Sequence, residues 1–424
     1  MSTRRPTILL IGTFDTKHVE LTRVEQLIEA LGGDVVTLDA SVGGAASSAG
    51  VSHSAESVAG AAGTTVAELA GMDRGDAVAV MQRGVAAVTT ELAREGRVDG
   101  ALCVGGAGAH LAGTAFQQLD IGFPKLIVTP LASGRRTFEA YTGLRDVAVM
   151  HTVVDVAGVN DLVDKVYRQA AGYIVGAVRA MDELAPEPSP EAGRPLVAAS
   201  MNGNTTPAVT RAKERLGALG YDLVAFHANG AGGRAMEDLV MARHFDAVLD
   251  FTTTELCFQE VGGLMDAGPD RMEAAGRMGV PQVLVPGCID FITTGRYEDA
   301  EREFPGRSLY RHNPELTLVR LTAAEMRNVG EVFARKASAS LGPVAVCIPT
   351  RGFSVPDSEG GPFWDVEADF EFIAALRDGV SPNVSVELVE AHVNDDAFAD
   401  VVVDTLLSLV DRPPAAASTE RSDG

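Results

Sequence analysis

The stretch TILLIGTFDTKHVELTRVEQLIEALGGDVVTL, residues 7–38, contains one complete unit of an α/β fold. Residues 7–11 are a short apolar run that is typical of a buried strand, and residues 35–38 are a second such run. Between them the apolar residues of 17–31 recur near one face of a helix, which Gly32 and Gly33 end. The order strand, helix, strand predicts a βαβ unit with parallel strands.

The same alternation continues along the chain. Further strands are predicted at residues 98–104, 125–128, 147–150, 196–200, 223–226, 247–250, 282–285, 344–348 and 385–389. We therefore predict an α/β fold with two Rossmann-like domains, each a mainly parallel sheet flanked by helices. Ligands of such sheets lie beyond the carboxyl ends of the strands, so the loops that follow the strands are the candidate sites.

Length and proline content set the expected domain boundaries. A chain of 424 residues is long enough for two domains. Three prolines within residues 186–190 cannot continue a helix and predict a linker over residues 185–194. The predicted domains are 1–184 and 195–412, followed by a disordered tail over 413–424.

The composition indicates an acidic cytoplasmic protein. Thirty-five Lys and Arg against 58 Asp and Glu give a formal charge of −23, which disfavours nucleic acids and anionic membranes as partners. The four cysteines lie far apart with no CxxC pair, and no HxH or HExxH spacing occurs, so we expect no metal site and a reducing compartment. No apolar run reaches the roughly 18 residues of a membrane span.

The loop after the first strand has the composition of a phosphate site. It contains Gly12, Thr13, Asp15, Thr16 and Lys17. Asp15 and Thr16 are suitable N-caps for a helix that begins at Lys17, and a helix start with a neighbouring positive charge suits a phosphate. An ordinary capped turn explains the same residues equally well.

The loop after the strand at 98–104 is richer in glycine. It contains Gly105, Gly106, Ala107 and Gly108, and then Gly113 and Thr114. Glycines between a strand and a helix form an anion-binding context, although neither GxxxxGK[ST] nor a clean GxGxxG is present. We predict a phosphate or nucleotide site here in preference to a merely flexible loop. A third loop, with Ser133, Gly134 and two arginines, is either a ligand loop or a solvated turn.

These motifs together resemble one known family. Residues 12–17, 105–108 with 113–114, 124–134 and 154–158 look like the Tm-one-like ATP-binding family, named for the tomato mosaic virus resistance protein. Residues 227–236, 250–256, 311–314 and 360–363 of the second half match it too, so that the resemblance covers about residues 7–409.

The resemblance implies a first domain that binds ATP, a second Rossmann-like domain and a homodimer. Magnesium could accompany the nucleotide. The implied ATP contacts are Gly12, Thr13, Asp15, Thr16, Lys17, Gly105, Gly106, Ala107, Gly108, Gly113, Thr114, Ser133 and Gly134. One departure is visible, because residues 109–112 fill a space where the family has a compact glycine and serine run leading into Gly-Thr.

Two loops of the second half could also hold a ligand. His227, Gly230, Gly232, Gly233 and Arg234 form a glycine-rich turn that suits an anion or is simply tight. Thr252, Thr253 and Thr254 precede Glu255, and these residues either hold a polar ligand or begin a helix without chemistry.

The candidate catalytic residues are Glu255 as a general base, His312 in a polar loop and Arg351 at a strand end. A set of residues near predicted strand ends or in polar loops could converge as an acid–base cluster or a metal site: His227, Glu255, Asp290, His312, Asp365 and His392. One hypothesis is an ATP-dependent enzyme that acts on a small organic substrate in the cleft between the domains. The alternative is a nucleotide-responsive binding or regulatory protein without turnover, since no Walker motif or nucleophile motif is present.

Overall fold

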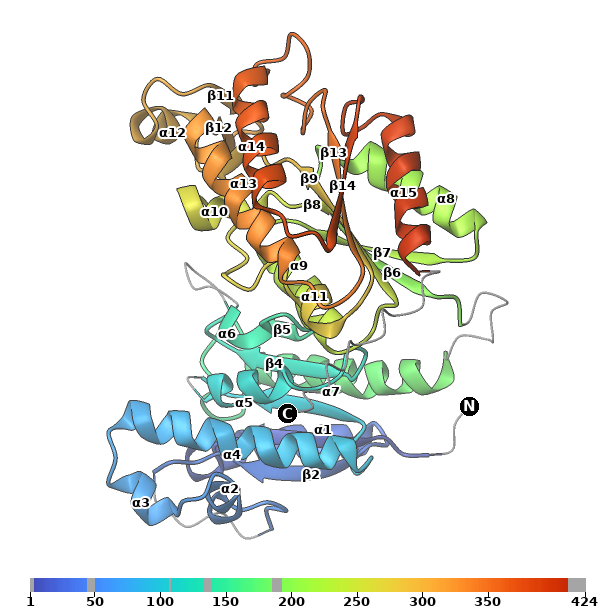
Figure 1. Ribbon diagram of the computed structural model, residues 1–424. Coiled ribbons are helices and arrows are strands. Elements are labelled where there is room, and N and C mark those ends of the chain that lie inside the picture. Colours follow the sequence, from blue (N-terminus) through green and yellow to red (C-terminus); the bar gives the residue numbers. More distant parts are fainter. Residues whose placement is uncertain (1–3, 44–49, 107, 133–138, 185–192, 411–424) are drawn as a thin grey trace, which may run out of the picture. The chain divides into compact units, whose positions relative to one another are not determined.

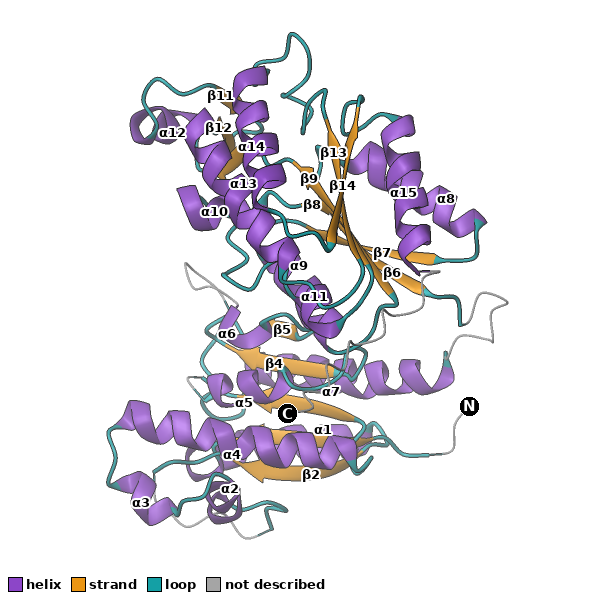
Figure 2. Ribbon diagram, in the orientation of Figure 1, coloured by secondary structure: helices purple, strands orange, loops and turns teal. Residues whose placement is uncertain are grey.

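The chain folds as two units, each built on its own parallel sheet (Figures 1 and 2). The computed structural model describes residues 4–43, 50–106, 108–132, 139–184 and 193–410. The units are Met1–Pro188 and Ser189–Gly424. The predicted α/β class with two mainly parallel sheets flanked by helices is confirmed.

The sheet of the first unit has five parallel strands. These are β1 (Thr7–Gly12), β2 (Asp34–Asp39), β3 (Gly100–Val104), β4 (Lys125–Thr129) and β5 (Ala148–His151). Their order in the sheet is β2-β1-β3-β4-β5. The chain thus adds β2 on one side of β1 and then crosses to the other side, so the topological switch point lies between β1 and β3.

Helices cover both faces of this sheet. One face carries α1 (Phe14–Ala30) and α7 (Asp161–Glu183), and the other carries α2 (Ala55–Ala61), α3 (Val66–Ala70), α4 (Arg74–Arg94) and α5 (Ala109–Phe116). The short helix α6 (Glu139–Thr142) packs on α5. Leu9 and Ile11 of β1 face the α4 side, whereas Ile8 and Leu10 face α1 and α7. Burial on both faces explains why the strand is a continuous apolar run.

The second unit repeats this topology with one more parallel strand. Its strands are β6 (Leu196–Met201), β7 (Asp222–His227), β8 (Ala247–Thr252), β9 (Gln282–Gly287), β13 (Val344–Pro349) and β14 (Val384–Val389). They lie in the order β7-β6-β8-β9-β13-β14. The switch point is therefore between β6 and β8, at the same place in the topology as in the first unit.

Helices also cover both faces of the second sheet. One face carries α8 (Thr206–Ala218) and α15 (Asp396–Val410). The other carries α9 (Ala231–Met241), α10 (Glu255–Val261), α11 (Ala274–Met278), α13 (Ala323–Ser338) and α14 (Val366–Gly379).

Equivalent hydrogen bonds occur at the strand starts within each of the two units. The backbone N–H of Thr7 donates to Asp99 Oδ2 at 2.8 Å, and that of Leu196 donates to Asp246 Oδ2 at 2.8 Å. The next strand of each unit begins with an Asp whose N–H donates to the carbonyl of a Pro, Pro6 in one unit and Pro195 in the other. The two units therefore match at the level of individual residues.

A small antiparallel sheet of the second unit was missed by the sequence analysis. It consists of β10 (Phe291–Thr294), β12 (Thr317–Arg320) and β11 (Leu309–Arg311) in this order, with α12 (Tyr297–Glu303) between β10 and β11. Its strands have three or four residues each, which is too short for a clear apolar pattern.

The prediction that Asp15 and Thr16 cap a helix beginning at Lys17 was wrong. The helix α1 begins at Phe14, so both residues lie in its first turn. Lys17 itself has non-helical angles, with φ −125° and ψ 25°, so the helix is kinked there. Across the described residues, no helix is long and apolar enough to cross a bilayer.

Candidate functional site

The two predicted phosphate loops of the first unit meet at its switch point. A Cβ added to Gly108 would lie 3.2 Å from Thr13 Cγ2, so the loop after β3 touches the loop after β1. A Cβ added to Gly106, by contrast, would meet no atom of the other described residues within 4 Å, its chain neighbours apart. The backbone of Gly106 thus borders open space at the edge of the sheet where α/β proteins bind ligands.

The start of α1 already holds an anion from the chain itself. The N–H of Phe14 donates to Asp39 Oδ1 at 3.1 Å, and the N–H of Asp15 donates to Ser41 Oγ at 3.2 Å. Asp39 is fully buried and is the last residue of β2. The free N–H groups expected at this helix start are therefore used internally, which leaves side chains and the glycine loop for a ligand.

Side chains of α1 hold the segment between β5 and α7. The Lys17 ammonium donates to the carbonyl of Val156, and the N–H of Gly158 donates to Glu20 Oε1 at 2.6 Å. Within this segment Val153 has a φ of 66°, in a turn closed by a 2.7 Å hydrogen bond from Val154 N–H to Thr152 O. A β-branched residue with positive φ in a three-residue turn is strained, so the segment holds an uncommon conformation.

Several predicted contact residues have packing roles. A Cβ on Gly113 would lie 2.3 Å from the Ala140 carbonyl oxygen, and one on Gly12 would lie 2.6 Å from a Leu21 methyl carbon. Gly113 and Thr114 are inside α5, where Thr114 is exposed. Ala107, Ser133 and Gly134 lie outside the described residues. Thr13 and Thr16 remain available, and their hydroxyls are 3.1 Å apart.

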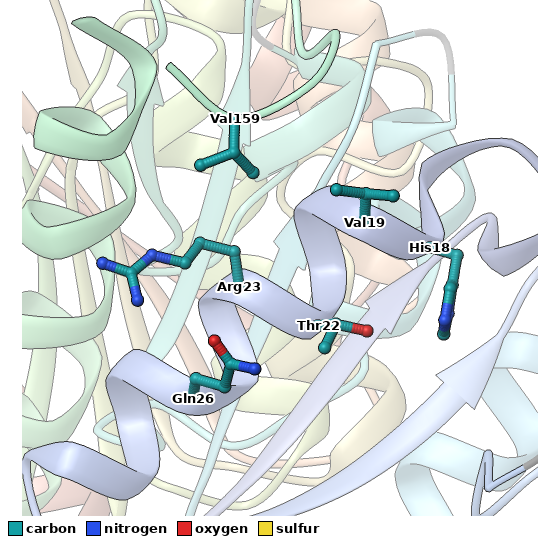
Figure 3. Close-up of a pocket in the computed structure, with 6 residues that line it drawn as sticks. All are labelled: His18, Val19, Thr22, Arg23, Gln26 and Val159. Atoms are coloured by element: carbon teal, nitrogen blue, oxygen red, sulfur yellow. The ribbon is translucent and has the colours of Figure 1, made fainter. Parts of the chain in front are cut away.

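A surface groove of about 330 Å³ lies along α1, starting at the residue after Lys17 (Figure 3). Five residues from successive turns of α1 line the groove, together with one residue of the segment before α7. They are His18, Val19, Thr22, Arg23, Gln26 and Val159. The sequence analysis missed this groove, because nothing in the helix pattern marks these residues.

The glycine-rich turn of the second unit binds Glu255. Oε1 of Glu255 accepts hydrogen bonds from the N–H groups of Gly230 at 2.6 Å and Gly233 at 3.2 Å. A Cβ on Gly233 would lie 2.1 Å from Glu255 Oε2, so only glycine allows this approach. Gly232 is likewise required by its close approach to the His227 carbonyl, 1.9 Å from an added Cβ. The predicted anion cradle is thus filled by a carboxylate of the chain.

A buried arginine completes the Glu255 site. Arg271 is 1% exposed, and its Nε donates to Glu255 Oε2 at 2.6 Å. Its Nη2 donates to Asp250 Oδ1 at 2.7 Å, and its Nη1 also contacts Glu237 at 3.2 Å. Burial raises the pKa of Glu255, and the charge of Arg271 opposes that rise. Sequence reasoning missed Arg271, since a lone arginine in a polar loop is indistinguishable from a surface residue.

The three threonines before Glu255 also have internal partners. Thr252 Oγ1 lies 2.7 Å from Thr205 Oγ1, Thr253 donates to the Val285 carbonyl at 3.0 Å, and Thr254 donates to the Phe291 carbonyl at 3.2 Å. None is more than 1% exposed. These hydroxyls stabilise the switch point of the second sheet.

The three predicted catalytic residues are not brought together. Glu255 is fully buried, whereas His312 is exposed in the turn between β11 and β12. Arg351 is exposed after β13 and pairs with Glu390 at 3.2 Å. Over the described residues, no hydrogen bond or ion pair joins any two of the three. Their catalytic assignment stays a prediction that this geometry does not support.

An acidic cluster does form beyond β9 and β13. Asp290, Asp357 and Asp369 are at most 8% exposed and share one buried cation, Arg320. Ser354 Oγ donates to Asp290 Oδ2 at 2.8 Å. Burial, together with the neighbouring Asp290 and Asp369, raises the pKa of Asp357 to about 9. Burial likewise raises the pKa of Asp369 to about 7, against the opposing charge of Arg320.

The other predicted members of that cluster have different roles. Nε2 of His392 bonds to the carbonyl of Ser354 at 2.9 Å, rather than to its hydroxyl. Asp365 caps α14 by accepting from Ala368 N–H at 3.0 Å. Among the described residues, no three His, Cys, Asp or Glu side chains are arranged to hold a metal ion.

The comparisons with known proteins cover both units. The family model described as "Uncharacterised protein family (UPF0261) N-terminal domain" matches residues 6–183, and the corresponding C-terminal domain model matches 194–410. A UPF0261 protein of Clostridium tetani is 38% identical over 409 residues, which are 96% of this chain and 99% of that protein.

Relatives occur in other bacteria and in a plant. A UPF0261 protein of Rhizobium meliloti is 37% identical over 401 residues, covering 93% of this chain and 97% of the relative. The ToMV resistance protein Tm-1 of Solanum lycopersicum is 35% identical over 339 residues, which are 79% of this chain but 45% of the tomato protein.

Proposed function

The chain belongs to the uncharacterised UPF0261 family, and from the geometry of its first unit we propose that it binds ATP between the loops after β1 and β3. The resemblance to the Tm-one-like family is confirmed by the match to the tomato protein. ATP binding itself is our proposal.

The observation that carries this proposal is the open backbone of Gly106 beside Thr13. The two loops approach each other at Gly108 and Thr13, and among the described residues a Cβ added to Gly106 would meet no atom within 4 Å beyond those of its chain neighbours. Backbone N–H groups of such a loop suit phosphate oxygens, and the hydroxyls of Thr13 and Thr16 add further donors. Because Asp39 occupies the α1 start, the phosphates would lie on the glycine-loop side.

Lys17 and Asp15 would complete the phosphate site. The Lys17 ammonium has three donors, of which the Val156 carbonyl uses one, so it can also neutralise phosphate charge. Within the described part of the chain, Asp15 Oδ1 is buried and has no hydrogen-bond partner. That oxygen is the carboxylate ligand that an accompanying magnesium ion would meet, and magnesium commonly binds through one or two carboxylates and the phosphates.

The fate of the nucleotide separates two further proposals. In the first, the protein is an ATP-dependent enzyme that acts on a small organic substrate. In the second, it binds nucleotide as a regulatory protein without turnover, and the internal bonding of Glu255 and the three threonines favours this alternative. We also propose a cytoplasmic homodimer: its four buried free cysteines suit a reducing compartment, and the dimer rests on the family resemblance.

Isothermal titration of the full chain with ATP and magnesium tests the proposal. Gly106→Val should abolish saturable binding and leave the melting temperature unchanged, because its side chain enters only the open space. Gly75→Val is the matched control, since an added Cβ there also meets nothing within 4 Å and Gly75 lies in α4. Absence of binding to the wild-type protein, or equal binding by Gly106→Val, would refute the site. Release of phosphate from bound ATP would then distinguish the enzyme from the regulatory protein.

A further inference from the structure

The groove along α1 is large enough for part of a small molecule and combines two apolar with four polar side chains. Its volume of about 330 Å³ lies at the lower end of ligand pockets. His18, Thr22 and Gln26 are four residues apart on one face of α1, so they form one wall. Figure 3 shows Val159 opposite this helix, with its side chain directed toward it.

Two of the lining residues are unusually exposed apolar side chains. Val19 is 62% exposed and Val159 is 43% exposed. They come from two different segments and line the same groove, so they offer a planar apolar ligand a surface on either side. The His18 ring adds a face on which an aromatic base can stack.

Of the described residues that line the groove, the one that is charged, Arg23, already has a partner within the unit. Arg23 Nε pairs with Asp164 Oδ1 at 2.7 Å, and Asp164 pairs with Arg168 as well. Asp164 is shared by two guanidinium groups, so it holds Arg23 toward α7 and offsets the charge of Arg23 only in part. The remaining polar groups, the Thr22 hydroxyl and the Gln26 amide, are the donors and acceptors that recognise the edge of a base.

The groove is joined to the phosphate loops through Lys17. Lys17 immediately precedes His18, and its ammonium bonds the carbonyl of Val156 in the segment that carries Val159. Glu20 also bonds this segment, through Gly158. The two walls of the groove are therefore fixed to each other beside the residue that would neutralise the phosphates.

We propose that this groove binds the purine base of the nucleotide, so that α1 recognises both ends of one ligand. This inference rests on the proposed ATP site and adds the part of the ligand that sets its selectivity. Base binding on the outer face of α1 also gives the exposed Val19 and Val159 a function that packing within the unit does not give them.

Isothermal titration of the full chain with two probes, ATP and inorganic tripolyphosphate, tests the base site. The wild-type protein should bind ATP at least tenfold more tightly than tripolyphosphate. Thr22→Trp fills the groove without changing charge and should weaken ATP to the level of tripolyphosphate, while tripolyphosphate binding stays within twofold. Thr210→Trp, on an exposed position of α8, is the matched control and should change neither probe.

The outcomes separate this inference from the proposed function. Equal wild-type affinities for the two probes, or unaltered ATP binding by a folded Thr22→Trp protein, would overturn the base site and leave the phosphate site standing. Failure of the wild-type protein to bind either probe would overturn both. Adenosine that competes with ATP in the wild-type protein but not in Thr22→Trp would support the groove independently.

Discussion

Glu255 Oε1 accepts a hydrogen bond from the Gly230 N–H at 2.6 Å, inside the turn whose glycines suggest a site for an external anion. The same carboxylate bonds Gly233 and Arg271 and is fully buried. The second unit therefore supplies the anion at this turn itself. Glu255, which the sequence suggested as a general base, connects the turn after β7, the start of α10 and the loop that carries Arg271.

Replacing Glu255 by Ala should destabilise the second unit strongly. The change leaves Arg271 Nε and two backbone N–H groups buried without an acceptor, whereas Asp250 and Glu237 still pair with Arg271, so the expected cost is about 1–3 kcal/mol, as for buried unsatisfied donors. Denaturant unfolding followed by circular dichroism measures the effect.

Chemical rescue distinguishes a lost anion from a general packing defect. Formate or acetate should restore part of the lost stability of Glu255→Ala, since either carboxylate fits the vacated cradle. Glu260→Ala, on the exposed side of the same helix, should change stability by less than about 0.5 kcal/mol. A neutral effect of Glu255→Ala would contradict the structural role.

The acidic cluster should make the second unit less stable as the pH rises. The pKa of Asp357 is raised to about 9 from an ordinary value of 3.8, so the folded state binds more protons than the unfolded state between these values. The free energy of unfolding must then fall with increasing pH across that window and level off above it.

Asp357→Asn isolates this contribution, because the amide stays neutral at every pH. Melting temperatures measured from pH 5 to 9 should decline less steeply in Asp357→Asn than in the wild-type protein. Asp378→Asn, an exposed position on α14, should retain the wild-type slope. Parallel curves for Asp357→Asn and the wild type would show that Asp357 is ionised in the folded state.

Lys17→Met should loosen the segment between β5 and α7 even without nucleotide. The change removes the bond to the Val156 carbonyl and lowers the local opening free energy by about 1 kcal/mol. Hydrogen exchange of residues 152–160 should be faster than in the wild type. Lys165→Met, at an exposed site on α7, should leave that exchange unchanged.

Gly113→Ala and Gly172→Ala should have opposite effects on the first unit. A Cβ at Gly113 would approach the Ala140 carbonyl to 2.3 Å, an overpacking that costs about 1–3 kcal/mol. A Cβ at Gly172 of α7 meets nothing within 4 Å, so alanine should gain about 0.5–1 kcal/mol. Thermal unfolding compares them, and a harmless Gly113→Ala would remove the packing explanation for that glycine.

The sequence was a good guide to the parallel sheets and a poor guide to the sites. Runs such as Ile8–Ile11 are apolar at every position because both faces are covered, so strands of this kind are visible without a structure. The small sheet of β10, β11 and β12 was not visible, since strands of three or four residues show no periodicity.

The partner of an anion cradle could not be found from local sequence. Asp39 lies 25 residues after Phe14, and Glu255 lies 25 residues after Gly230, so nothing in either turn signals the carboxylate that fills it. A glycine-rich turn therefore predicts that some anion binds, and only the fold decides whether it comes from the chain or from solution.

The matched contacts of Thr7 with Asp99 and of Leu196 with Asp246 have an evolutionary consequence. Two sheets with the same strand order, the same Asp at the start of the second strand and the same Pro before the first are most simply explained by duplication of one ancestral gene segment. Equivalent positions of the two halves can then be compared to see which residues changed after the duplication. At the end of the second strand one copy has Asp39 and the other has His227. The two copies therefore differ at the carboxyl edge of the sheet, where α/β proteins bind ligands.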